Sequence, residues 1–60
     1  MRAYSLTELF NLTRTELFTL HARIVTEIAE LLENSGERTV GIINLRNIRR
    51  VLAHPRCAPS

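Results

Sequence analysis

A turn signal between two long stretches of helical periodicity constrains this chain more than any other feature. Asn34, Ser35 and Gly36 follow one another, and such a cluster ends a helix and begins a turn. Apolar residues recur every three or four positions on both sides of it, and no alternating pattern typical of strands is sustained. We therefore expect an all-α fold in which two helices, at about 14–33 and 37–53, form a hairpin.

The N-terminal part carries the same helix-start signature twice. Ser5 with Glu8, and Thr13 with Glu16, each fit the capping-box spacing, in which the first side chain and the fourth exchange hydrogen bonds with the backbone. At about 100° per residue, a long helix extended backward would place Arg14 inside its apolar face. We therefore predict a short helix at about 6–12 and a break near Thr13. One continuous helix is the alternative.

The chain is long enough for one domain only. His54 precedes Pro55, and the residue before a proline disfavours the helical conformation. We expect a single helical domain over residues 1–54 and a flexible tail over 55–60. A domain of this size buries only about 60% of the surface that its unfolded chain exposes. Cys57 is the single cysteine, so a disulfide within the chain is excluded, and a partner chain is the remaining source of stability.

The apolar arc of the long helix is wide. It covers roughly 200° of a helical wheel, whereas a surface helix with one neighbour needs about 100°. The short N-terminal helix can cover some of the excess, and a second copy can cover the rest. We therefore expect a homodimeric helical bundle made of two hairpins. The expected interface residues are Phe18, Leu20, Ile24, Val25, Ile28 and Leu31.

Two polar residues interrupt the apolar faces, and two isoleucines lie outside them. His21 is interpreted as a core or interface histidine rather than as a ligand or a pH switch. Asn44 either fixes the register of the helices, as a buried asparagine does in coiled coils, or meets a helix end or solvent. Ile42 and Ile43 lie among arginines, where they are either scattered exposed residues or part of a second contact surface.

Positive charge gathers in the second half of the chain. Residues 34–60 hold five arginines and one glutamate, whereas residues 1–33 hold three arginines and five glutamates. The candidate binding residues lie on one side of the last helix: Arg46, Arg50 and His54 form a row at four-residue spacing, and Arg49 lies beside this row. Arginine binds phosphates and guanine edges, so this row is a candidate contact for nucleic acid. A solvated face or a contact for an acidic protein explains it equally well.

Catalytic and metal-binding patterns are missing from the sequence. There is no aspartate for a Ser-His-Asp triad, and no CxxC, HxxxH or HExxH spacing occurs. We expect a non-enzymatic protein without cofactor or metal. No apolar run approaches the roughly 18 residues of a membrane span, and the N-terminus lacks a signal-peptide pattern. With its lone cysteine, the protein is expected to be cytoplasmic and not membrane-bound.

These features together predict a small protein-interaction module: an adaptor, regulator or inhibitor that binds another protein through its helix surfaces. A nucleic-acid-binding regulator that uses the arginine-rich face of the last helix is the alternative. The size and the paired hairpins resemble the Rop family of plasmid-encoded RNA-binding regulators, whose dimer is a four-helix bundle. The resemblance is architectural, rests on no shared motif and assigns no role to any residue. An accessory protein of a bacterium or a mobile element is the expected context.

Overall fold

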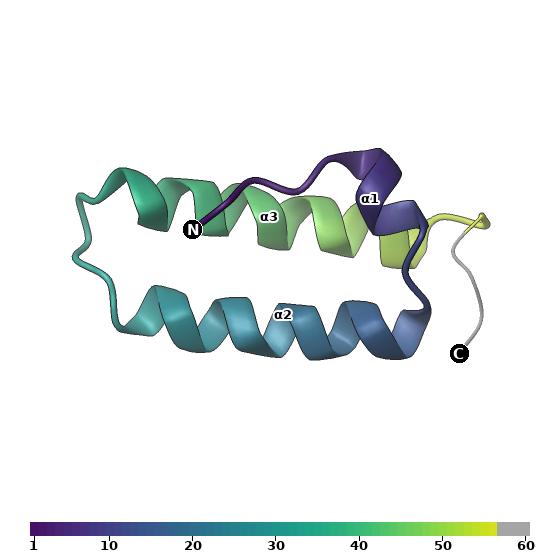
Figure 1. The fold of residues 1–60 in the computed structure, drawn as a ribbon, viewed down its shortest axis with the longest axis horizontal. Coiled ribbons are helices and arrows are strands. Elements are labelled where there is room, and N and C mark those ends of the chain that lie inside the picture. Colours follow the sequence, from purple (N-terminus) through teal and green to yellow (C-terminus); the bar gives the residue numbers. More distant parts are fainter. Residues whose placement is uncertain (57–60) are drawn as a thin grey trace.

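The computed structural model describes residues 1–56, and within them it confirms the all-α fold. It contains a short helix α1 (Leu6–Phe10) and two long helices, α2 (Arg14–Ala29) and α3 (Gly36–Ala53). Figure 1 shows α2 and α3 side by side as an antiparallel hairpin. Residues 1–5, here named the N-terminal strap, run in extended form along α3 and lead into α1, which packs near the C-terminal end of α3.

The break between α1 and α2 is made by Thr13. Its hydroxyl accepts a hydrogen bond from the Glu16 backbone N–H at 3.1 Å, and its own N–H donates to the Glu16 carboxylate at 2.9 Å. This is the complete capping box that the repeated signature predicts, so the alternative of one continuous helix is wrong. The first helix ends at Phe10, two residues before the expected position, because Asn11 and Leu12 donate to carbonyls only three residues back.

The long helix α2 ends at Ala29, four residues before the predicted position. In a continued helix, the Ile28 carbonyl would accept from the N–H of Leu32. Here it accepts from the N–H of Leu31 at 3.1 Å and from a guanidinium N–H of Arg38 at 3.1 Å. Arg38, in the first turn of α3, thus satisfies a carbonyl at the end of α2. Helical periodicity along the sequence does not predict such a contact between distant residues.

The opposite end of the hairpin repeats this arrangement in reverse. Arg14, in the first turn of α2, donates from its guanidinium to the Leu52 carbonyl near the end of α3 at 2.9 Å. Arg14 and Arg38, here named the cross-caps, each place a cation at the C-terminal end of the neighbouring helix. Such a cation interacts favourably with the helix dipole and satisfies an orphan carbonyl. The cross-caps thus join both ends of the antiparallel pair.

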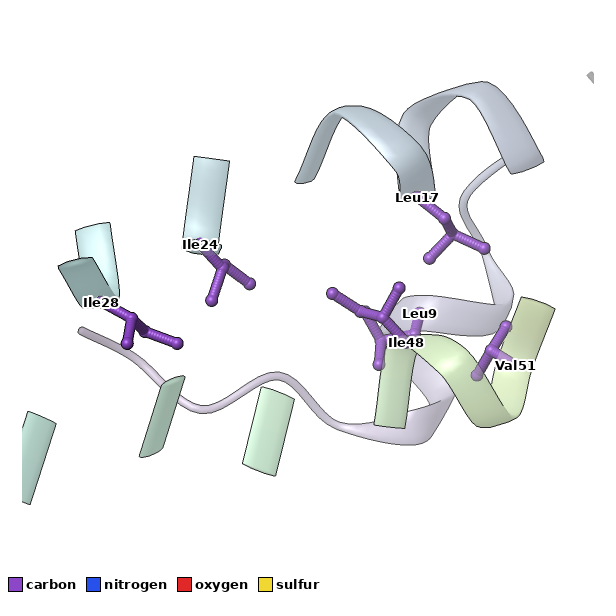
Figure 2. Packing of buried hydrophobic residues seen from close by; sticks show 6 residues of the cluster. All are labelled: Leu9, Leu17, Ile24, Ile28, Ile48 and Val51. Carbon is purple, nitrogen blue, oxygen red and sulfur yellow. The ribbon is translucent and has the colours of Figure 1, made fainter. Parts of the chain in front are cut away.

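The core is a single layer between the hairpin and α1. Six apolar side chains form it, and Figure 2 shows them: Leu9, Leu17, Ile24, Ile28, Ile48 and Val51. The layer is thin at one point because Gly41 lies opposite Ile28. A Cβ atom at position 41 would lie 2.7 Å from the Ile28 side chain and 2.9 Å from the Met1 sulfur. Only glycine lets α2 and the N-terminal strap approach α3 this closely.

Asn44 holds the N-terminal strap. Its side chain is fully buried. The carboxamide oxygen accepts from the Tyr4 backbone N–H at 3.0 Å, and the carboxamide nitrogen donates to the Arg2 carbonyl at 2.8 Å. The amide therefore pairs with the strap as a neighbouring strand would, one donor and one acceptor. The N-terminal amino group of Met1 adds an ion pair with Glu37 at 3.5 Å.

This role differs from those that the sequence suggested for Asn44. Register fixing and a solvent contact both assume that the residue lies at a helix–helix interface or on the surface, whereas its amide binds an extended segment 40 and 42 positions earlier in the chain. The strap also covers part of the wide apolar arc of α2. Leu20 lies beside Tyr4, and Leu31 lies beside Met1. Part of the surface assigned to a second copy is therefore covered within the chain.

The C-terminal tail begins in an ordered turn. The N–H of Arg56 donates to the His54 ring nitrogen Nδ1 at 3.1 Å, and the Arg56 guanidinium lies over the Phe10 ring. The remainder of the predicted flexible tail, which includes Cys57, lies outside the described residues.

We predict that replacing Asn44 by Ala releases the N-terminal strap. The change removes both part-buried hydrogen bonds between α3 and the strap, which together cost about 2 kcal/mol of the free energy of unfolding. Urea titration measures this loss, and hydrogen exchange at the Tyr4 amide should become fast. Asn47→Ala, on the same helix, is the matched control: it removes an amide that makes no hydrogen bond to the strap, so the Tyr4 amide should stay protected. Unchanged protection of the Tyr4 amide in Asn44→Ala would contradict the assignment.

Candidate interaction face

The hairpin of α2 and α3 has two broad faces, and the N-terminal strap covers one of them. Met1 and Tyr4 of the strap identify this face, because each lines a surface hollow together with side chains of the hairpin. These hairpin side chains include Glu16, Leu20, Arg23, Glu27, Glu30, Leu31 and Glu37. On α3, Asn44 marks the same side through its hydrogen bonds to the strap.

The other face is here named the open face. Residues two positions apart on a helix point about 160° away from each other. Phe18 is two positions from both Glu16 and Leu20, Val25 is two positions from both Arg23 and Glu27, and Ile42 is two positions from Asn44. They therefore lie opposite the strap. The open face consists of Phe18, His21 and Val25 on α2 and Ile42, Leu45, Arg46 and Arg49 on α3.

The register of the hairpin places the apolar residues of the open face next to one another. Ile28 lies against Gly41, and Arg14 reaches Leu52, so residues of α2 and α3 whose numbers add up to about 67 are level in this antiparallel pair. Val25 is level with Ile42, and Phe18 with Arg49. Phe18 is 55% exposed, Val25 46% and Ile42 51%. Half of the six large apolar side chains that are exposed within residues 1–56 thus belong to one face.

The two faces carry opposite charge. Four glutamates, Glu16, Glu27, Glu30 and Glu37, lie on the strap side. Arg46 and Arg49 are exposed at the edge of the open face. The ion pairs found in the described part of the chain are Met1–Glu37 and Arg2–Glu8, and neither involves these arginines. The open face is therefore apolar at its centre and basic at its edge.

The predicted row of basic residues is divided by the fold. Arg46 and Arg49 border the open face, whereas Arg50 and His54 line a hollow beside Phe10 of α1. The His54 ring packs edge-on against Phe10, with ring centroids 5.2 Å apart. Each four-residue step along a helix turns the side chain by about 40°, so a row of three drifts around α3 until its last member meets α1.

The six predicted interface residues are also divided. Ile24 and Ile28 are 1% and 8% exposed and belong to the core within the chain. Leu20 and Leu31 lie beside the strap, and only Phe18 and Val25 are on the open face. Ile42, which the sequence marked as a hint of a second contact surface, joins them. Leu45 is partly exposed there, and sequence reasoning placed it with the apolar face of α3 without recognising it as surface.

The part of the chain that the structure describes contains neither a cluster of metal ligands nor a membrane-spanning helix. No group of three or more histidine, cysteine, aspartate or glutamate residues in that range could hold a metal ion. None of the helices described is both long and apolar enough to cross a membrane. In comparisons with known proteins, no family model, no curated protein and no solved structure matches the chain.

We predict that replacing Arg38 by Ala destabilises the protein, whereas replacing Arg46 or Arg49 by Ala does not. Arg38→Ala removes the charged hydrogen bond to the end of α2 and should lower the free energy of unfolding by about 1 to 2 kcal/mol. Arg46→Ala and Arg49→Ala, matched changes on the same helix, should each alter it by no more than about 0.5 kcal/mol. Thermal or urea unfolding measures all three. A large loss in Arg46→Ala or Arg49→Ala would show that these residues maintain the fold and are not available for a partner.

Proposed function

We propose that the protein is a non-enzymatic protein-interaction module, an adaptor, regulator or inhibitor, and that the open face is its contact surface. One observation carries this proposal: Phe18, Val25 and Ile42 remain about half exposed on one face of the hairpin, outside the buried core that the helices share. Exposed apolar side chains that gather on one face, unlike ones scattered singly, mark sites of association.

The residue types on the open face support the same proposal. Aromatic side chains and arginines are enriched at protein–protein contacts, and they contribute a large share of the binding energy there. Phe18 and Arg49 are level across the hairpin, and Arg46 lies one turn from Arg49. These arginines have no carboxylate partner among residues 1–56, so a partner's carboxylates can meet them without first displacing an internal ion pair.

A nucleic-acid-binding regulator is the second candidate. The observation that favours it is that the open face combines an exposed aromatic ring, Phe18, with Arg46 and Arg49, since base stacking and phosphate contacts use such side chains. Against it, Val25, Ile42 and Leu45 make the centre of this face apolar, whereas nucleic-acid contacts are more polar and more strongly basic than protein contacts. Arg50 and His54, the other members of the predicted row, lie beside α1.

The homodimeric bundle expected from the sequence is a proposal about the same surface. The homodimer was expected because the apolar arc of α2 is too wide for one neighbouring helix. The strap and α1 cover part of that arc. Of the six residues expected at the interface, only Phe18 and Val25 are exposed, so a second copy would have to bind there. A cytoplasmic location stays a prediction that rests on the sequence.

Partner capture tests the proposed function. We expect the immobilised full chain to retain a specific protein from a lysate of the source organism, whether or not nuclease is added. The double variant Phe18→Ser with Val25→Ser, on the open face, should lose that protein. Thr19→Ala with Thr26→Ala, also exposed on α2 but outside the face, is the matched control and should retain it. Capture that nuclease abolishes would favour the nucleic-acid candidate, and capture by the open-face variant would reject the open face.

Sedimentation equilibrium tests the homodimer. A dimer through the open face requires that Val25→Glu yields a folded monomer, because the charge is buried only in the assembly. Ile24→Glu, one residue earlier, should unfold the chain at every concentration, since Ile24 belongs to the core of the single chain. Circular dichroism separates the two results. A wild-type chain that stays monomeric and folded at high micromolar concentration would reject the homodimer.

A further inference from the structure

We propose that the open face binds an acidic amphipathic helix of another protein. This inference rests on the proposed function and names the chemistry of the partner. Two features of the open face carry it. One is an apolar seam between two antiparallel helices, and the other is a frame of positive charge around that seam.

The apolar residues of the open face have the spacing that a bound helix requires. Phe18 and Val25 are seven residues apart on α2, which is two helical turns or about 10 Å. Ile42 and Leu45 line the same seam from α3. An amphipathic helix that binds such a surface contacts it through apolar side chains spaced three, four and seven residues apart. A third helix placed along the seam would bury the exposed parts of these side chains between α2 and α3, as in an ordinary helical bundle.

Positive charge surrounds the seam on several sides. Arg46 and Arg49 follow its long edge on α3. The cross-caps Arg14 and Arg38 span the hairpin at its two ends, and Arg14 also lies over the ring of Phe18 at 5.6 Å. No residue of the open face is acidic, because the glutamates of α2 and α3 line the strap side. A ligand that places carboxylates beside an apolar stripe complements this pattern.

The positive charge of the open face disfavours a second copy of the chain as its partner. A two-fold contact sets one surface against itself, so the open faces of two copies would bring two sets of arginines together with no carboxylate between them. Like charges in a contact cost affinity. Nucleic acid fits the arginines but leaves Val25, Ile42 and Leu45 against a phosphate backbone, where their apolar surface gains nothing. An acidic helix is the occupant that matches both the apolar centre and the basic edge.

The test uses the full chain and a synthetic peptide of 18 residues, the length of α3, with leucines on one side of the helix and glutamates on the other. Binding is followed by fluorescence anisotropy and by amide chemical shifts. We expect saturable binding that weakens with added salt, with the largest shifts at Phe18, Val25, Ile42 and Leu45 and little change at the strap side. A peptide with the same leucines but lysines in place of the glutamates should bind at least about tenfold more weakly.

A charge swap provides the sharpest control. Arg46→Glu with Arg49→Glu should weaken binding of the glutamate peptide by about tenfold or more and should strengthen binding of the lysine peptide. Arg23→Glu with Arg56→Glu carries the same total change of charge away from the open face and should leave the preference for the glutamate peptide in place. Circular dichroism confirms that each variant is folded before affinities are compared.

Several outcomes would overturn the inference. Equal binding of both peptides would mean unspecific apolar adhesion, and tight binding of an oligonucleotide that excludes the glutamate peptide would identify nucleic acid instead. A wild-type dimer that excludes the peptide would identify a second copy. If the peptide fails but the open-face variant still loses its native protein in the capture experiment, the proposed function stands and only the acidic helix is wrong.

Discussion

The pairing of one buried carboxamide with the N-terminal backbone is the interaction on which the rest of this structure depends. Two helices alone form a layer with two exposed faces, and neither face can be buried by the other helix. Asn44 binds the backbone of residues 2 and 4 and so turns an extended segment into a third structural element. The fit is tight because Gly41 leaves room for Met1. One face of the hairpin is thereby covered, and the other becomes the molecule's apolar surface.

The eight arginines of the chain have different physical roles, although they look alike in the sequence. Arg14 and Arg38 each donate to a carbonyl near the end of the neighbouring helix. Arg2 pairs with Glu8 and lies over the Tyr4 ring, so it belongs to the attachment of the strap. Within residues 1–56, Arg46 and Arg49 make none of these contacts. Arg46 and Arg49 lie at the edge of the open face, so their charges are available to a partner's carboxylates.

The distribution of charge over the two faces follows from the same topology. The strap brings the positive N-terminal amino group to Glu37, and it covers the side of α2 that carries the glutamates. The open face keeps the arginines of α3 and the apolar ridge of α2. The hairpin is therefore acidic on the face that its own chain occupies and basic on the face that it leaves exposed. Association through the exposed face selects partners by charge as well as by apolar contact.

The local sequence by itself determined the helical class, a turn near Asn34, the break at Thr13 and the end of α3 before Pro55, because caps, turns and periodicity act over a few residues. The tertiary structure decided which side of each helix is surface. Ile24 and Val25 are neighbours on one apolar arc, yet one is core and the other is exposed. Arg49 and Arg50 are neighbours in one basic row, yet they border different sites. The reason is that burial depends on the strap, which Asn44 holds although it lies 40 residues after Tyr4 and 42 after Arg2 in the sequence. Helical periodicity does not predict such a contact.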